Sequence, residues 1–420
     1  MSTTFSRTNA VGLRATIGRL INETPVTDIH THLYAPAFRG LLLYGIDELL
    51  TYHYLIAEFF RASDMPYEQF WGMAKPQQAE AIWQTLFMDQ VPCSEATRGV
   101  VTVLHRLGLD VGGRKLEEYR GWFNEQRPED YVDHVLNVAN LESAVMTNDP
   151  FDDQERPIWE AGYEHHPRLH AVLRIDPLLN NWAKSHTQLQ AWGYNVDEAC
   201  SANSLSQTRR FLDHWVRRMK ALYMAVSLPP EFAFPEDSAR AKLIEEAVLP
   251  VAQEHNIPFA MMIGVKRGVN PALRLGGDGV GLASLDPVEH LCREFQQNKF
   301  MVTLLSRENQ HALCVTSRKF RNLLPFGCWW FLNNPSLIKE ITEMRIEMLG
   351  PTTIPQHSDA RVLEQVVYKW DHFREILAHT LRHKYADIVS TGWVLHEEEM
   401  QRDIARMLGG NFWSFLERKL

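Results

Sequence analysis

The sequence is poor in cysteine, in long apolar runs and in positive charge, and each shortage excludes a class of protein. Its five cysteines are widely spaced with no C-x-x-C pair, which excludes a disulfide framework or a zinc ribbon. The longest charge-free apolar run near a predicted strand, Leu323 to Leu332, is too short to span a bilayer. The net charge of −9 argues against nucleic-acid and anionic-membrane partners.

The N-terminal segment also lacks the unbroken apolar stretch of a secretory signal, because Arg7, Arg14 and Arg19 interrupt it. Together with the scattered cysteines, this absence leads us to expect a cytoplasmic protein. An acidic small molecule would have to be held by local arginines or lysines, because the overall field repels anions.

Short apolar, β-branched runs recur along the chain, and amphipathic helical stretches separate them. Such near-continuous apolar runs are typical of parallel strands that are covered on both faces. Eight strands alternating with helices favour an α/β fold of the (β/α)8 TIM-barrel type over a doubly wound open sheet. The eight predicted strands are Pro25–Leu33, Leu141–Asn148, His170–Asp176, Leu222–Leu228, Ile257–Gly264, Lys299–Ser306, Leu323–Trp330 and Thr353–Asp359.

A barrel of this type needs about 250 residues, so about 170 are left over. Residues 46–140 have helical periodicity without a clear strand, and we expect them to form a helical insertion on the loop after strand 1. Residues 1–45 would then hold an N-terminal segment and the first strand. Residues 141–420 would hold the rest of the barrel and a C-terminal helical extension.

The strongest local signal is Asp28-Ile29-His30-Thr31-His32, at the end of the first predicted strand. Side chains alternate along a strand, so His30 and His32 point the same way, into the barrel mouth. Two imidazoles placed like this are suited to binding a metal ion. The alternative is a pair of core histidines, each bonded to a backbone carbonyl.

A third ligand must come from another strand end. Asp359 closes the eighth predicted strand, which neighbours the first in a closed barrel. Its carboxylate would complete a His-His-Asp site, unless it only caps the helix that follows. His357, two residues earlier, is a further ligand candidate or a partner of one.

The H-x-H pair and the late Asp resemble the amidohydrolase superfamily, and the wider set of motifs resembles the uronate isomerase (glucuronate isomerase) family. The likeness extends from about residue 25 to the C-terminus. The segments that carry it are Val26–Leu33 (VTDIHTHL), Asp47–Tyr54 (DELLTYHY), Leu173–Asp176 (LRID), Gly327–Asn334 (GCWWFLNN), Ser358–Arg361 (SDAR) and Asn411–Trp413 (NFW).

The sequence departs from the superfamily's binuclear pattern. It has no lysine on the fourth predicted strand, and Met262 stands on the fifth where many relatives carry histidine. We therefore expect one divalent metal ion, held by His30, His32 and Asp359. Zinc is our expectation for it, although manganese and iron suit the same ligands.

The resemblance implies aldose–ketose isomerisation of uronic acids: D-glucuronate to D-fructuronate and D-galacturonate to D-tagaturonate. The reaction moves a proton between C2 and C1 through a cis-enediol. Asp359 is the implied base, and Arg361 would stabilise the developing oxyanion. His53 and Tyr54 would assist ring opening and hold the sugar oxygens, unless they only pack within the inserted helices.

Two further residues would bind the substrate. Arg174, at the end of the third predicted strand, can grip the uronate carboxylate as a fork, with a structural ion pair to Asp176 as the alternative. Trp330 would form a wall of the sugar site, unless it is only a core aromatic residue. The resemblance also suggests a homo-oligomer.

Two other function classes stay open on the sequence alone. A mononuclear metal-dependent hydrolase or decarboxylase would use the same His-x-His and Asp, with water as the nucleophile. A non-catalytic sugar-acid binder could use the same scaffold, because one fold hosts many functions.

Overall fold

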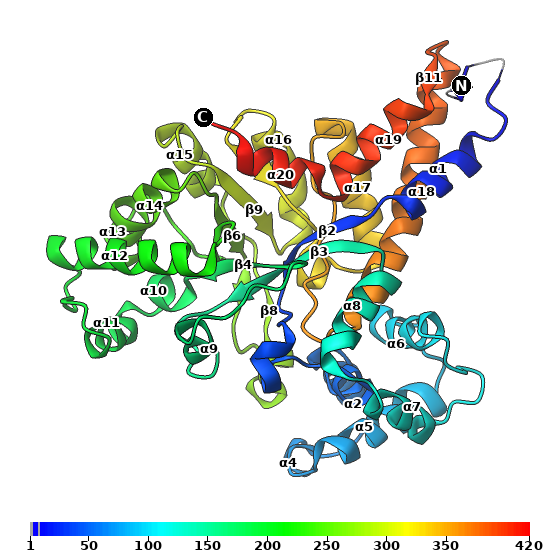
Figure 1. Cartoon of the computed structure of the whole chain (residues 1–420), viewed down its shortest axis with the longest axis horizontal. Helices are drawn as coiled ribbons and strands as arrows, with labels where there is room; N and C mark the ends of the chain where they lie inside the picture. Colours follow the sequence, from blue (N-terminus) through cyan, green and yellow to red (C-terminus); the bar gives the residue numbers. More distant parts are fainter. Residues whose placement is uncertain (1–2, 7–8) are drawn as a thin grey trace.

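A curled parallel sheet lies at the centre of the protein, whose computed structural model describes residues 3–6 and 9–420 (Figure 1). Arg7 of the N-terminal segment lies outside these described residues. The main sheet has seven strands within them, in the order β10-β9-β6-β5-β4-β3-β2, and every neighbouring pair is parallel. Its strands are β2 Val26–Thr31, β3 Leu141–Asn148, β4 Leu169–Arg174, β5 Met224–Leu228, β6 Phe259–Ile263, β9 Phe300–Leu304 and β10 Leu323–Pro325.

The eighth predicted strand, Thr353–Asp359, is wrong as a regular strand. Among the described residues this segment forms only an isolated parallel bridge, between Phe326 and Ile354. Pro355 lacks the N–H that a ladder needs, and Asp359 has a positive φ of 55°, which ends extended pairing.

The same segment nevertheless bonds to both edge strands of the sheet. On one side the Gly327 N–H donates to Ile354 O at 2.7 Å. On the other side, the Asp359 N–H donates to His30 O at 3.2 Å, and the His32 N–H donates to Ala360 O at 2.7 Å. Residues 354–360 therefore join the two edges of a TIM-like curled sheet.

Helices cover the outer face of the sheet, and the longer ones carry apolar residues at helical spacing. In α12 the Ser201 hydroxyl accepts from the Ser204 N–H at the N-terminus, and buried residues recur from Leu205 to Met219. The elements that follow β3 to β10 along the chain are α9 Arg156–Glu160, α10 Asp176–Asn180, α11 Trp182–Ala191, α12 Ala202–Met219, α13 Ala239–Leu243, η3 Ile244–Val248, α14 Leu249–Glu254, α15 Asp286–Glu294, η5 Arg307–Asn309, α16 Gln310–Ser317, η6 Trp330–Leu332, α17 Pro335–Leu349 and α18 Gln365–Ser390.

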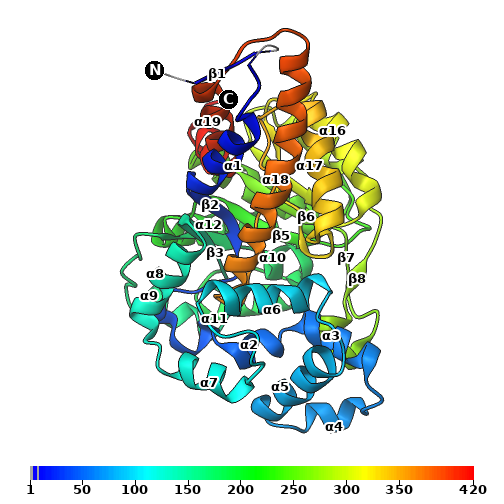
Figure 2. The same ribbon diagram turned by 90° about the vertical axis from the view of Figure 1, so that its right-hand side faces the viewer.

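The chain between β2 and β3 is helical and gathers at one end of the sheet, below it in Figure 2. Its elements are η1 Pro36–Leu41, α2 Ile46–Leu50, α3 His53–Ala62, α4 Tyr67–Trp71, α5 Lys75–Trp83, η2 Gln84–Met88, α6 Glu95–Arg106, α7 Leu116–Asn124 and α8 Pro128–Val138. After β6, a hairpin of β7 Val265–Lys266 and β8 Gly279–Val280, with η4 Pro271–Gly277 between them, packs on α3.

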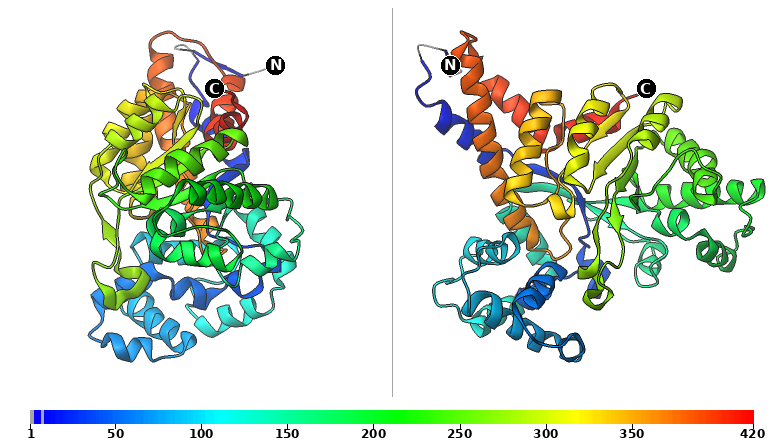
Figure 3. Two further views of the ribbon diagram at one scale, coloured as in Figure 1. Left: turned by 90° about the vertical axis from the view of Figure 1, so that its left-hand side faces the viewer. Right: turned by 180° about the vertical axis from the view of Figure 1, so that it is seen from behind.

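The long helix α18 joins these helices to the sheet (Figure 3). His372 on α18 contacts Glu95 at 2.7 Å and Thr102 at 2.8 Å, both on α6. Gly99 of α6 lies so close to the Tyr368 ring that a Cβ there would be 2.7 Å from it. The α6 backbone therefore rests directly on α18.

The C-terminal elements close the opposite end of the sheet. Phe412 and Phe415 are buried against strand residues such as Ile29 and Met301, and Gly409 approaches Thr27. The remaining elements are β1 Thr4–Phe5, which pairs with β11 Leu395–His396, α1 Leu13–Glu23, α19 Glu397–Ala405, η7 Arg406–Gly410 and α20 Asn411–Glu417. No helix within the described residues is long and apolar enough to cross a membrane.

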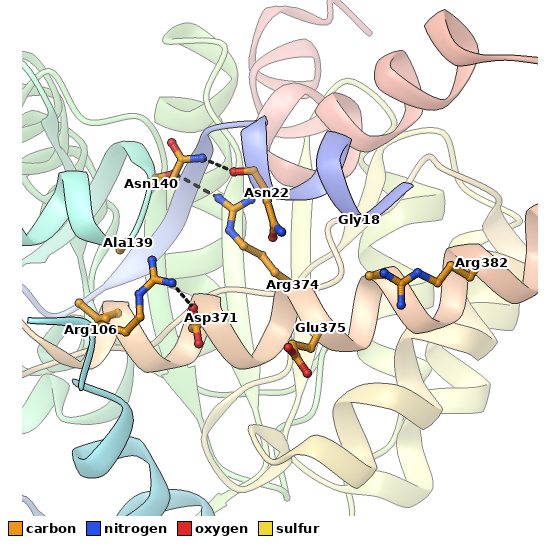
Figure 4. A pocket seen from close by; sticks show the side chains of 11 residues that line it. Gly18, Asn22, Arg106, Ala139, Asn140, Asp371, Arg374, Glu375 and Arg382 are labelled. Atoms are coloured by element: carbon orange, nitrogen blue, oxygen red, sulfur yellow. Dashed lines mark hydrogen bonds and ion pairs between the residues drawn. The ribbon is translucent and has the colours of Figure 1, made fainter. Parts of the chain in front are cut away.

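A cavity of about 510 Å³ lies between α1, α6 and α18, near the amino ends of β2 and β3 (Figure 4). Arg374 extends from α18 into it and donates to the backbone carbonyls of Ile21, Thr24 and Asn140. Burial lowers the pKa of Arg374 to about 10. This arginine fixes the chain where it enters both strands, because its guanidinium joins carbonyls of the segments that precede β2 and β3.

Candidate active site

Two histidines at the carboxyl end of β2 share one face of the strand. His30 is 1% exposed, whereas 30% of the His32 side chain is exposed. Their ring centroids are 5.3 Å apart and the rings are nearly perpendicular. The two side chains therefore lie close together, as the alternation of side chains along a strand predicts.

Asp359 completes a cluster with these histidines. Its Oδ1 lies 3.3 Å from His32 Nε2 and 3.8 Å from His30 Nε2. Burial alone would raise the pKa of Asp359, but the His32 ring, followed by His30 and His357, lowers it to about 2. The left-handed φ of this non-glycine residue costs about 1–3 kcal/mol, and such strain concentrates at functional sites.

Asp28 holds the segment that carries Asp359 against β2. Its Oδ1 accepts from the Ser358 N–H at 3.0 Å, and its Oδ2 accepts from Trp370 Nε1 at 2.8 Å. Burial raises the pKa of Asp28 to about 6, although both hydrogen bonds favour the carboxylate. The Asp that precedes the H-x-H pair is therefore an anchor for the segment that carries Asp359.

Tyr223 sets the orientation of His30. The Tyr223 hydroxyl donates to Ile29 O at 2.7 Å, so it can accept from His30 Nδ1, which lies 3.0 Å away. A proton on Nδ1 leaves the Nε2 lone pair free to face Asp359. Partners of this kind orient metal-binding histidines in proteins.

The cluster fits a divalent cation. His30 Nε2 and Asp359 Oδ1 are buried without a hydrogen-bond partner among the described residues, and buried polar atoms are seldom left so. The ligand atoms of His30, His32 and Asp359 lie within 4.8 Å of one another. Two imidazole nitrogens and a carboxylate oxygen suit zinc, manganese or iron.

His53 and Tyr54 begin α3 and extend the site beyond the cluster. Burial lowers the pKa of His53 to about 4, so this imidazole is neutral at pH 7, and its Nε2 has no partner within the described chain. The His53 ring lies 4.5 Å from the Tyr54 ring and 5.6 Å from the Trp330 ring, measured between centroids. The helical segment after β2 thus meets η6 at this point.

Arg174 lies at the end of β4, on a cavity of about 460 Å³. Its Nη2 is 3.0 Å from Asp176 Oδ1, so the structural ion pair considered from the sequence is present. Of the Arg174 side chain, 30% is exposed, and Lys184 and Arg267 line the same cavity. An anion could therefore still reach this guanidinium.

Arg361 makes contacts of its own near Asp359. Its Nη1 donates to Leu41 O at 2.8 Å, and its guanidinium carbon lies 5.3 Å from the centre of the Tyr34 ring. Burial lowers the pKa of Arg361 below its ordinary value. This hydrogen bond to Leu41 therefore attaches the Arg361 side chain to η1, which follows β2.

Comparison with solved structures identifies close relatives. A uronate isomerase from Bacillus halodurans is 54% identical, with a TM-score of 0.95 over 97% of this chain and 96% of that chain. This chain belongs to the uronate isomerase family. The uronate isomerase of Thermotoga maritima (17% identity, TM-score 0.78) and the glucuronate isomerase of Caulobacter crescentus (14% identity, TM-score 0.75) share the fold over at least 94% of both chains. No protein-family model and no curated protein matched.

These relatives confirm the family resemblance expected from the sequence. They also confirm that the protein is an isomerase. Among the site residues, His30, His32 and Asp359 come together, as do His53 and Trp330. Sequence reasoning gave no role to Tyr223 or Asp28, because their contacts involve residues far away in the chain. Asp28 had a signal, since it precedes the H-x-H pair, whereas Tyr223 had none.

His357 lies within van der Waals reach of this cluster, 5.4 Å from His30 between ring centroids, with neither ring nitrogen bonded to a described residue. Burial lowers its pKa to about 4. Gly327, with a φ of 61°, makes room for this ring, because a Cβ at Gly327 would be 1.7 Å from His357 Nδ1.

We therefore expect Gly327→Ala to destabilise the protein by about 3 kcal/mol, from the left-handed φ and the displacement of His357. Gly12→Ala is the matched control, because Gly12 is left-handed, with a φ of 88° and a ψ of −13°, and has open space around it. That variant should lose only about 1 kcal/mol. Urea unfolding of both measures the difference, and equal unfolding midpoints would contradict the close contact with His357.

Proposed function

We propose that the protein interconverts D-glucuronate with D-fructuronate and D-galacturonate with D-tagaturonate. The observation that carries this proposal is the 54% identity to a uronate isomerase over 97% of the chain. The cluster of His30, His32 and Asp359 supports it. Arg174, at the end of β4, supports it too. The alternative hydrolase or decarboxylase gains no support from these relatives.

The isomerisation moves one proton from C2 of the open-chain aldose to C1. In our proposal, the Asp359 carboxylate removes the C2 proton, which gives a cis-enediol, and returns that proton to C1. The proton of the C2 hydroxyl passes to O1, so C1 becomes the ketose hydroxymethyl carbon and C2 the carbonyl. Negative charge develops on these oxygens, and we assign Arg361 to stabilise it.

His53, Tyr54 and Trp330 would act on the sugar itself. His53 is neutral at pH 7 and buried, so it can accept the anomeric hydroxyl proton during ring opening. Burial raises the pKa of Tyr54 well above its ordinary value, so its hydroxyl stays protonated and donates to a sugar oxygen. Trp330, 5.6 Å from His53, would form the wall of this site.

We propose that one divalent metal ion, zinc in our expectation, is held by His30 Nε2, His32 Nε2 and Asp359 Oδ1. Such an ion supplies positive charge that polarises a bound oxygen. The unpartnered His30 Nε2 and Asp359 Oδ1 support this assignment. Manganese and iron would suit the same ligands.

The wider organisation expected from the sequence is also part of the proposal. We assign residues 1–45 to an N-terminal segment with the first barrel strand, 46–140 to a helical insertion and 141–420 to the remaining barrel with its helical extension. The hydrogen bonds of residues 354–360 to both sheet edges support a closed (β/α)8 barrel. A homo-oligomer and a cytoplasmic location stay predictions.

The direct test is an NMR assay of the purified protein with D-glucuronate in D₂O, with zinc or manganese supplied. We expect ketose signals of D-fructuronate, with deuterium at C1 to the extent that Asp359 exchanges its proton with solvent. Unchanged D-glucuronate and D-galacturonate would overturn the isomerase and leave the hydrolase as the leading function.

A second prediction concerns the uronate carboxylate. If Arg174 binds it, Arg174→Met should raise KM for D-glucuronate, through a loss of about 2–5 kcal/mol in binding. Arg267→Met is the matched control, because Arg267 lines the same cavity but 57% of its side chain is exposed, against 30% for Arg174. Its KM should change by less than about threefold. Steady-state kinetics measure both, and an unchanged KM in Arg174→Met would refute this assignment.

A further inference from the structure

Lys369 is a buried lysine on α18. Only 4% of the residue is exposed. Within the described residues, its ammonium forms neither a hydrogen bond nor an ion pair. Lysine is rarely buried without a partner, because removing an ammonium from water is costly.

Lys299 shows what a structural buried lysine looks like in the same protein. It is 2% exposed, and its ammonium donates to the carbonyls of Leu416 and Arg418. Burial lowers the pKa of both Lys299 and Lys369 to about 8. They differ in their acceptors: Lys299 has two carbonyls at the amino end of the sheet, and Lys369 has none in the part of the chain that the structure describes.

The Lys369 ammonium faces aromatic rings instead. Its Nζ lies 5.3 Å from the centre of the Tyr54 ring and 5.3 Å from that of Tyr368. The carboxylates that favour its charged form are, in order, Glu95, Asp359 and Asp28. Glu95 is already bonded to His372 and Arg98. Lys369 thus places a positive charge on the side of the active site that Tyr54 forms.

A cation over an aromatic face is attracted by the electrons of the ring, more strongly where water is excluded. The same charge withdraws electron density from a phenol, which makes its hydroxyl a better hydrogen-bond donor. It also holds the ring in one orientation before the reaction begins, so the ring does not have to reorganise during the reaction. Tyr54 is the residue to which the proposed function assigns donation to the sugar.

We propose that Lys369 is a positioning residue for Tyr54, whose ring it holds and whose hydroxyl it strengthens as a donor to the uronate. The proposal rests on the proposed isomerase activity for its kinetic part. Its contact with Tyr54 can be tested without any turnover.

The kinetic test is a double-mutant cycle on D-glucuronate isomerisation. We expect Lys369→Met to lower kcat by about tenfold, as one desolvated cation–π contact would, with a smaller change in KM. In the Tyr54→Phe background, the same substitution should change kcat by less than about twofold, because the donor is already gone. Equal losses in both backgrounds, or an unchanged kcat in Lys369→Met, would overturn the proposal.

Two variants control for the general effect of removing a buried lysine. Lys369→Arg keeps the charge and should retain most of the activity that Lys369→Met loses. Lys299→Met removes a lysine of the same exposure and should lower the melting temperature while kcat stays at the wild-type value. Loss of kcat in Lys299→Met equal to that in Lys369→Met would overturn the specific role of Lys369.

A spectroscopic measurement separates this proposal from the proposed function. In protein labelled with ¹³C at the tyrosine Cζ, the Tyr54 resonance is identified by its loss in Tyr54→Phe. It should move in Lys369→Met and stay near its position in Lys369→Arg and Lys299→Met. If the wild-type protein isomerises no uronate but the resonance moves, the function fails and the Lys369–Tyr54 contact stands. A resonance that does not move in Lys369→Met refutes the contact.

Discussion

The site depends on one stretch of backbone pairing, in which residues 358–360 lie along the end of β2. Two main-chain hydrogen bonds join Asp359 to His30 and Ala360 to His32, and Asp28 fixes the Ser358 N–H. Backbone bonds of this kind set the spacing between chains without regard to side chains. They bring a carboxylate next to two imidazoles that are more than three hundred residues away in sequence.

Helix α18 carries this arrangement to the helices between β2 and β3. Its first turns contact the anchor Asp28 through Trp370, the Tyr54 ring through Lys369, and α6 through Tyr368 and His372. A shift of α6 or α3 would therefore displace Tyr54 and the end of β2 together. Charges of opposite sign, on Asp28, Asp359 and Lys369, are buried within this region, where their interactions are stronger than in water.

Patterns of sequence were sufficient where local chemistry decides the outcome. Seven of the eight apolar runs form strands within the described residues, and alternation along β2 correctly aligned His30 with His32. The eighth run failed as a strand because Pro355 and the left-handed Asp359 interrupt the ladder. Tyr223 and Lys369 could not be predicted, because their importance comes from contacts across the fold and not from any local motif.

The central claim is that three distant residues form one metal site. An X-ray anomalous difference map of crystals grown with zinc, recorded at the zinc edge, tests it most directly. We expect one strong peak in contact with His30 Nε2, His32 Nε2 and Asp359 Oδ1. A map without a peak at these atoms, or with its strong peak at the exposed group of Asp213, Glu254 and His255, would contradict it.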